Sequence, residues 1–563
     1  MRARGLHFRH GLLVLIGAAA VAALLFPLEA GRIAELPLLA LASFARMVAA
    51  YALALVFALG FGTMAATNKR AATVMLPLLD VLQSIPILGF FPAALVFFVT
   101  AFQGHPVGLE FAVVFLIFTS MAWNMAFGVY ESLTTIPGDL QDAARTLGLD
   151  GTVRFRRLNL PAMVPRLVHN SVLSWTNGWF FLVASEVFSA FGATYSRPGI
   201  GAYIARAGLA GDGAAIAFGL GTLAAMVLAL DMVVWRPLSL WSQRFRVEGV
   251  ASGAAAGTGH YEPFRWMPTF PRTRRWLSQR SRPFADAYFR ASARLDRGLT
   301  AHPKVPRTVL RVDLSLFLVV FLLVVVSGLI GLIRLFSSPL PPGAREIPLA
   351  AVSSFLRLGL AYLLAIAWTI PAAVFVGRNP RASRLLTPLL EVFASLPATA
   401  LLPVILGFSL VVAGGLGLEA SLAALLIAVF AMQWYLLFNL IGGVRTIPGD
   451  LEEAARAYGL RGLTYWRRVL LPAMIPSLVT GSITAWGAGW NALVVSEYIR
   501  FGDRVYEVPG LGQILNRATF GTPPDYELLL LTILAMIVVV LVMNKALWRP
   551  LFNRASLRYR MDV

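Results

Sequence analysis

The sequence IPGDLQDAARTLGLDGTVRFRRLNLPAMVPRLV at residues 136–168 recurs as IPGDLEEAARAYGLRGLTYWRRVLLPAMIPSLV at residues 447–479. About 20 of the 33 positions are identical without a gap, at a constant offset of 311 residues. Each copy interrupts an otherwise apolar sequence, so we expect each to lie outside a membrane. The acidic and alanine-rich part favours a helix, and Gly148 or Gly459 can adopt the positive φ that ends one. The stretch therefore predicts two short helices joined at a glycine and presented on the membrane surface.

The spacing of residues within this stretch resembles the EAA loop of the permeases of ABC importers. The motif is Asp142-Ala143-Ala144, Gly148, Leu158 and Leu160-Pro161 in the first copy, and Glu453-Ala454-Ala455, Gly459, Val469 and Leu471-Pro472 in the second. The first copy has Asp where the family has Glu, and both lack the usual Ile before Leu-Pro. The resemblance implies that the two loops are coupling helices, which transmit the nucleotide-driven closure of an ATPase dimer to the membrane spans.

The residues that the resemblance assigns to ATPase coupling are Asp142, Ala143, Ala144, Arg145, Gly148, Glu453, Ala454, Ala455, Arg456 and Gly459. A helix with an exposed acid next to an arginine can insert into a groove of a soluble partner and form charge-assisted hydrogen bonds there. The alternative interpretation is that the acids only cap or solvate a surface helix.

The composition indicates a polytopic membrane protein. Of 563 residues, 58% are hydrophobic and 13% charged, and the mean hydropathy is +0.73. The absence of Cys excludes disulfides and thiolate chemistry, and the six His have no metal-ligand spacing. The net charge of +20 lies mostly in arginine-rich loops, so the positive-inside rule explains it better than nucleic-acid binding does.

Apolar runs predict twelve transmembrane helices with both termini in the cytoplasm. In the first half they lie near 11–28, Leu41–Ala66, Leu79–Thr100, Glu110–Tyr130, Asn170–Phe191 and Ala214–Trp235. In the second half they lie near Leu314–Phe336, Ala350–Val376, Leu389–Ala413, Leu418–Ile441, Gly481–Ile499 and Glu527–Trp548.

The offset of 311 residues extends well beyond the repeated loop, which indicates a tandem duplication of a six-span unit. We expect a permease repeat at 1–240, a basic cytoplasmic linker at 241–312 and a second repeat at 313–563. An even number of spans gives both repeats the same orientation, related by pseudo-two-fold symmetry about an axis along the membrane normal. The predicted fold class is an all-α polytopic membrane protein of two tandem six-helix repeats.

The chain contains no motif for chemistry of its own. None of its three Lys follows a GxxxxGK pattern, so ATP and Mg²⁺ would bind a separate ATPase chain, and no cofactor is expected in this one. No catalytic triad, carboxylate pair or metal cluster is evident, which argues for a transport subunit and against an enzyme.

Ionisable residues inside predicted spans suggest a site. Arg46 and Arg357 fall near the outer ends of their spans, as do Glu186 and Glu497, at matching repeat positions. The arginines either pair with the glutamates or snorkel to the interface, or else they face a central path and attract an anion.

Polar residues that differ between the repeats are candidates for the substrate pathway. A solute without two-fold symmetry favours divergence at the positions that it touches. With the two arginines, the pathway candidates are Gln83, Asn124, Asn177, Gln433, Tyr435, Asn491, Arg46 and Arg357.

Beyond the loop, Trp179, Glu186 and the Pro-Gly-Ile/Leu-Gly sequences at 198–201 and 509–512 resemble the nitrate/sulfonate/taurine type of permease in a duplicated, fused version. The resemblance implies import of a small inorganic or organic anion across the bacterial inner membrane. It implies two ATPase subunits at the cytoplasmic face and a periplasmic or lipid-anchored solute-binding protein. An ion-gradient-driven transporter with two six-helix repeats is the alternative, although that class has no need of two matched acid-Ala-Ala loops.

Overall fold

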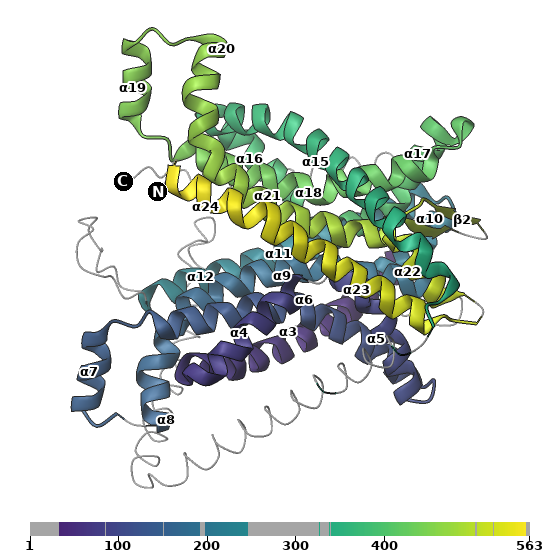
Figure 1. Cartoon of the computed structure of the whole chain (residues 1–563), viewed down its shortest axis with the longest axis horizontal. Helices are drawn as coiled ribbons and strands as arrows, with labels where there is room; N and C mark the ends of the chain where they lie inside the picture. Colours follow the sequence, from purple (N-terminus) through teal and green to yellow (C-terminus); the bar gives the residue numbers. More distant parts are fainter. Residues whose placement is uncertain are drawn as a thin grey trace.

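The protein is a bundle of long helices in two halves that lie side by side, shown in a computed structural model (Figure 1). The structure describes residues 33–84, 86–149, 151–191, 198–245, 339–501, 504–521 and 523–558, with 326 and 337. The expected spans at 11–28 and Leu314–Phe336, the linker and both termini lie outside or almost outside the described residues. Their predicted structure and orientation therefore stay predictions.

The first half contains a series of helices with short 3-10 and π-helical turns. They are α3 Leu36–Thr67, α4 Lys69–Ser84, α5 Ile87–Ala101, α6 Pro106–Thr134, α7 Gly138–Thr146, α8 Gly151–Arg154, η1 Phe155–Asn159, α9 Leu160–Phe191, α10 Ile200–Leu209, α11 Gly213–Leu230, η2 Asp231–Trp235, α12 Arg236–Ser242 and η3 Gln243–Phe245.

The second half repeats this order and, among the residues that the structure describes, also contains a β-hairpin. Its elements are η4 Pro342–Glu346, α15 Ile347–Arg378, α16 Pro380–Ser395, η5 Ala398–Leu401, α17 Leu402–Ala413, η6 Gly414–Leu416, α18 Glu419–Arg445, α19 Gly449–Ala457, α20 Gly462–Tyr465, η7 Trp466–Leu470, α21 Leu471–Ser496, β1 Tyr498–Phe501, β2 Arg504–Glu507, α22 Leu511–Phe520, α23 Tyr526–Met543, η8 Asn544–Trp548 and α24 Arg549–Arg558.

Eight continuous helical runs within the described residues are long and apolar enough to cross a membrane. They are Leu36–Thr67, Pro106–Thr134, Gly213–Phe245, Pro342–Arg378, Ala398–Leu416, Glu419–Arg445, Gly462–Ser496 and Tyr526–Ala555. The polytopic all-α class is therefore confirmed, whereas the full count of twelve spans stays a prediction.

Two of the predicted transmembrane helices are interrupted and not continuous. The expected helix Leu79–Thr100 is divided, since α4 ends at Ser84 and α5 begins at Ile87. The expected helix Leu389–Ala413 is divided after Ser395 in the same way. Pro86 and Pro397 explain both breaks, because proline has no N–H and disfavours the helical conformation in the preceding residue.

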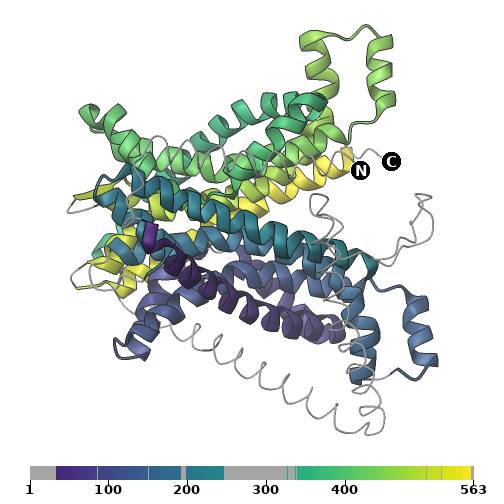
Figure 2. The same cartoon turned by 180° about the vertical axis from the view of Figure 1, so that it is seen from behind.

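A third predicted span ends early. The expected helix Gly481–Ile499 stops at Ser496, and the chain turns into an antiparallel hairpin in which Ile499 pairs with Tyr506. The hairpin lies at the opposite end of the bundle from α7–α8 and α19–α20, which project as two separate arms (Figures 1 and 2). The arms thus lie at one end of the molecule, and the hairpin and α10 lie at the other end.

Matching side-chain contacts show that the repeat extends into the packing. The Tyr51 hydroxyl donates to Ser171 over 3.0 Å, and the hydroxyls of Tyr362 and Ser482 lie 2.6 Å apart at the equivalent positions. Each tyrosine joins a cluster of two tryptophans: Trp175 and Trp235 in the first half, Trp486 and Trp548 in the second. The second member of each pair ends a π-helical turn, an irregularity often found at functional sites.

Candidate functional site

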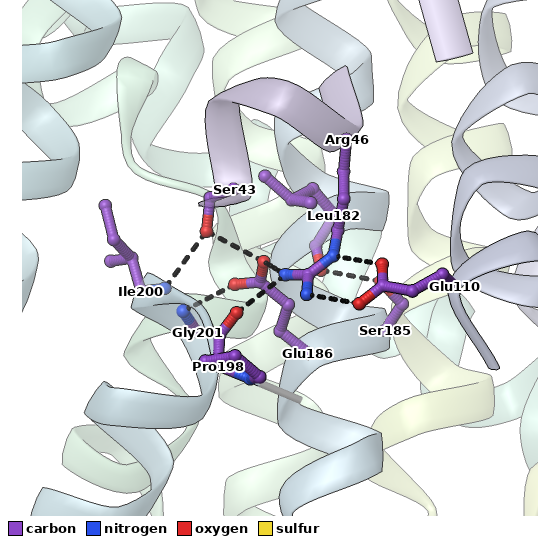
Figure 3. A network of polar contacts seen from close by, with 9 residues as sticks. All are labelled: Ser43, Arg46, Glu110, Leu182, Ser185, Glu186, Pro198, Ile200 and Gly201. Atoms are coloured by element: carbon purple, nitrogen blue, oxygen red, sulfur yellow. Dashed lines mark hydrogen bonds and ion pairs between the residues drawn. The ribbon is translucent and has the colours of Figure 1, made fainter. Parts of the chain in front are cut away.

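A buried network of polar side chains holds together the end of the first half that lies opposite the arms (Figure 3). The Arg46 guanidinium donates through Nη1 to Glu186 Oε1 over 2.7 Å and to the Pro198 carbonyl over 2.9 Å. Ser43 donates to the same Glu186 oxygen over 2.7 Å and accepts from the Ile200 N–H over 3.0 Å. These contacts connect α3, α9 and the first turn of α10, so Arg46 pairs with a carboxylate and does not face an open path.

The second half contains the same network at the equivalent positions. Arg357 and Ser354 both donate to Glu497 Oε1, and the Leu511 N–H donates to Ser354 over 2.9 Å. A Cβ on Gly510 would lie 2.2 Å from the Glu497 carboxyl carbon, which explains why this position needs glycine. The sequence Pro-Gly-Ile/Leu-Gly therefore serves to bring the backbone against a buried carboxylate.

The two networks differ by one acid. Arg46 also forms a bidentate pair with Glu110 on α6, at 2.7 Å from Nε and 2.8 Å from Nη2. The position equivalent to Glu110 is Ser421, and the ion pair recorded for Arg357 is with Glu497. Sequence reasoning placed Glu110 only at the start of a span, because a residue without a counterpart in the other repeat gives no pairing signal.

A cavity of about 820 Å³ lies between the two halves. Its wall includes residues of α4, α5, α6 and α9 from the first half, and of α16, α18, α21, α23 and η8 from the second. Among the residues that the structure describes, none of those that line the cavity is Asp, Glu, Lys or Arg. A neutral cavity built from both repeats is suited to a solute that must be bound briefly and then released.

Nine pairs of equivalent positions line this cavity from both repeats. They are Gln83/Ala394, Ile87/Ala398, Ser120/Ala431, Trp123/Trp434, Asn124/Tyr435, Leu173/Thr484, Thr176/Gly487, Asn177/Ala488 and Phe180/Asn491. Only Trp123 and Trp434 are the same residue. The arginine, serine and glutamate at the centre of the buried networks are the same residue in both repeats, whereas eight of the nine cavity pairs differ.

The structure brings five of the eight pathway candidates together. Gln83, Asn124, Asn177, Tyr435 and Asn491 all line the cavity. The other three, Gln433, Arg46 and Arg357, are not among the lining residues. Gln433 lies on α18 between the lining residues Ala431 and Trp434 without being one of them.

The ten coupling candidates lie on the two arms, and the arms have the same backbone design. Gly148 and Gly459 have φ of +66° and +68°, as expected from sequence. Each glycine N–H donates three residues back, to Arg145 or Arg456, and the following leucine N–H donates to Ala144 or Ala455. This pair of bonds is a Schellman motif, which ends α7 and α19 and turns the chain back toward the membrane.

Exposure differs along each arm in a repeated way. Ala144 and Ala455 are buried, whereas Asp142, Ala143, Arg145, Glu453, Ala454 and Arg456 are exposed. Leu147 and Tyr458, at equivalent positions beside the turn, are 74% and 84% exposed. Each arm thus presents acid, arginine and an apolar tip to its surroundings, as an interface with a soluble protein requires.

The second arm is attached to the bundle by an ion pair that the first arm lacks. Arg378, the last residue of α15, donates to Glu452 on α19 over 3.0 Å, and its guanidinium lies 5.1 Å from the Tyr465 ring centroid. The equivalent first-half residues are Thr67, Gln141 and Arg154. In the first arm, Asp142 instead pairs with Arg145 on its own helix over 2.9 Å.

Within the described ranges, no group of three or more His, Asp or Glu side chains is arranged to hold a metal ion.

Comparison with known proteins identifies the fold. The family described as "binding-protein-dependent transport system inner membrane component" matches twice, at residues 58–240 and 365–547. The nitrate import permease protein NrtB of Leptolyngbya laminosa is 29% identical over 150 residues, which are 27% of this chain and 51% of the relative. The taurine transport system permease protein TauC of Escherichia coli is 27% identical over 201 residues, or 35% of this chain and 68% of the relative.

A bicarbonate transport system permease protein, CmpB of Synechococcus elongatus, is 27% identical over 152 residues, or 27% of this chain and 51% of the relative. The chain thus spans about half the length of two of these relatives and about two thirds of the third. The double family match covers more than half of the chain and both arms. The chain therefore belongs to the family of binding-protein-dependent transport system inner membrane components, and it carries two copies of the family domain in one polypeptide.

Proposed function

We propose that this chain is the membrane permease of an ATP-driven ABC importer and forms the complete translocation path for a small anion. The observation that carries the proposal is the neutral cavity between two family domains, with one arm from each domain at the same end of the bundle. The alternative of an ion-gradient-driven transporter receives no support, since the family is defined by dependence on a binding protein.

An anion is the solute class that the relatives and the cavity favour together. Relatives are named for nitrate, taurine, bicarbonate and sulfonates. In the described part of the cavity wall there is no carboxylate that would attract a cation and no arginine or lysine that would hold an anion tightly. Uncharged hydrogen-bond donors replace part of the hydration of an anion without neutralising its charge. Such donors favour weak binding and release over tight binding.

ATP hydrolysis would come from two subunits that dock on the coupling arms. The acids, arginines and exposed tips of α7 and α19 supply charge-assisted hydrogen bonds and apolar anchors for that contact. A solute-binding protein would deliver the solute at the opposite end, beside the hairpin and α10. In this arrangement the arms are cytoplasmic and both termini lie on the cytoplasmic side.

The stoichiometry tests this function directly. Native mass measurement of the complex, purified with its ATPase, is expected to give one permease chain and two ATPase chains. Uptake of a labelled anion into proteoliposomes should require ATP, the ATPase and the binding protein. Two permease chains per ATPase pair would contradict the single-chain path, and uptake driven by an ion gradient without ATP would contradict the importer.

A further inference from the structure

The cavity wall is too apolar and too large to be fitted to an inorganic oxyanion alone. Five tryptophans and four phenylalanines are among its lining residues, and its volume of about 820 Å³ is in the range of sites for organic molecules. A solute with a few polar atoms and no apolar part would leave most of this wall without a partner. The wall is instead suited to a solute that also has an apolar body.

Several polar side chains in the wall already have hydrogen-bond partners in the protein. The Asn491 amide accepts from the Leu88 N–H over 3.2 Å and donates to the Gly487 carbonyl over 2.9 Å. Asn439 donates to the Tyr435 carbonyl over 2.8 Å. One of the two N–H donors of each amide therefore serves the protein itself, as does the Asn491 side-chain oxygen.

Two further polar members of the wall, Asn124 and Ser120, have partners in the protein as well. The Asn124 amide donates to the Asn170 carbonyl over 3.3 Å and to Ser174 Oγ over 3.2 Å. The Ser120 hydroxyl donates to the Ile117 carbonyl of its own helix over 2.6 Å. Their donors stabilise the contact of α6 with α9 or the helix itself.

Among the lining side chains that carry an amide or a hydroxyl, three have no hydrogen-bond partner in the part of the chain that the structure describes: Asn177 on α9, Tyr435 on α18 and Asn544 in the π-helical turn η8. Each can donate a hydrogen bond, and none carries a charge. All three side chains are half-buried, and their polar atoms are not among the buried ones without a partner, so these atoms are accessible from the cavity and can bond to a molecule that enters it.

We infer that Asn177, Tyr435 and Asn544 contact the oxygen atoms of the transported solute, and that this solute is an organic anion whose apolar part lies against the aromatic wall. The inference rests on the proposed function and deepens it. Asn544 adds a contact from a π-helical turn, and Asn124 and Asn491 become structural residues in place of pathway residues. The repeat supports the division, because Asn177 corresponds to Ala488 and so can be changed to alanine without loss of a helix contact.

Tryptophan fluorescence of the full chain in lipid nanodiscs, titrated with hexane-1-sulfonate, tests the inference. The tryptophans of the wall report occupancy, and the signal is expected to saturate. Asn177→Ala, Tyr435→Phe and Asn544→Ala are each expected to weaken the apparent Kd about threefold to tenfold, the factor that one hydrogen bond contributes. Nitrate is expected to bind more weakly than hexane-1-sulfonate.

Ser120→Ala is the matched control, because it removes a donor in the same wall that already serves the backbone. The second repeat has Ala431 at that position, so the variant is expected to fold and to bind with unchanged apparent Kd. Equal weakening in Ser120→Ala and Asn177→Ala, or tighter binding of nitrate than of hexane-1-sulfonate, would overturn the inference.

Uptake separates this inference from the function on which it rests. A complete transporter whose uptake of either anion does not require ATP contradicts the proposed function itself. A transporter that imports hexane-1-sulfonate with wild-type apparent KM in all three variants contradicts only the assignment of the contact residues. Raised KM in the three variants, with unchanged ATP hydrolysis in the absence of solute, supports it.

Discussion

The Leu88 N–H and the Asn491 side-chain oxygen lie 3.2 Å apart and join the two repeats beside the cavity. On the other side of the pseudo-two-fold axis, the Thr399 hydroxyl donates to the Phe180 carbonyl over 3.2 Å. Thr399 is equivalent to Leu88 and Phe180 to Asn491. The same two positions therefore connect the halves twice, with the side chain as acceptor on one side and as donor on the other.

Thr399→Val is expected to weaken this connection while preserving the shape of the side chain. The loss of one hydrogen bond is expected to lower the free energy of unfolding by about 0.5–1.5 kcal/mol, which reduces Tm in detergent. Thr222→Val is the control, because that hydroxyl bonds only within its own helix α11. An equal fall of Tm in both variants would show that the contact between halves has no special role.

Glu497→Gln is expected to harm the protein more than Glu186→Gln. The first change leaves Arg357 without a carboxylate partner, whereas Arg46 keeps its bidentate pair with Glu110. Breaking a buried ion pair from one side costs about 3–5 kcal/mol. Yield of folded protein and Tm are the measurements, and the reverse order of the two variants would contradict the role of Glu110.

Gly148→Val and Gly459→Val are expected to abolish transport and preserve membrane insertion. A Cβ has open space at both positions, so the cost comes from forcing a β-branched residue to positive φ. Gly449→Ala is the control, since that glycine also has open space but begins α19 at an ordinary φ. ATP-driven uptake at the wild-type rate in the double glycine variant would contradict a role in coupling.

Arg378→Gln is expected to uncouple ATP hydrolysis from transport by freeing the second arm from α15. The first arm has no equivalent ion pair, so Thr67→Ala at the matching position is expected to have no effect. Exchanging the charges in Arg378→Glu with Glu452→Arg should restore part of the coupling. The readout is solute imported per ATP hydrolysed, and a ratio unchanged by Arg378→Gln would sink the idea of an asymmetric attachment.

The β-hairpin should lose stability in acid. The Arg517 guanidinium donates to Glu507 over 2.9 Å and holds the pKa of that carboxyl below its usual value. A lowered folded-state pKa contributes stability above the unfolded pKa, and this contribution is lost as pH falls through the folded value. The Tm difference between wild type and Glu507→Gln is thus expected to be present at neutral pH and to shrink in acid. A difference that is constant with pH would contradict the pairing.

Much of the structure could be predicted from the sequence because the chain contains a repeat. Residues at equivalent positions of the two halves were expected to make equivalent contacts. The offset aligned Arg46 with Arg357 and Glu186 with Glu497. In the structure each arginine forms an ion pair with the glutamate of its own repeat, which was one of the alternatives. Periodicity and hydropathy gave the long helices. They missed the breaks at Pro86 and Pro397, since an apolar run has the same hydropathy whether its helix is continuous or bent.

Residues without a counterpart were the hardest to find. Glu110 and Arg378 form ion pairs that their equivalents Ser421 and Thr67 cannot form, so comparison of the halves gave no signal for them. Divergence between repeats did select cavity residues such as Asn177 and Tyr435. It could not separate amides that face an open cavity from amides such as Asn491 that bond to backbone, because that difference is set by geometry.

The nine paired cavity positions, of which one is identical, have a consequence for how such a protein can change over generations. In a permease assembled from two copies of a single gene product, each mutation alters both walls at once. In this fused chain a mutation alters one wall and leaves the other as it was. Solute preference can therefore change through single substitutions that alter the cavity wall of one repeat. The wall supplied by the other repeat stays unchanged at each step.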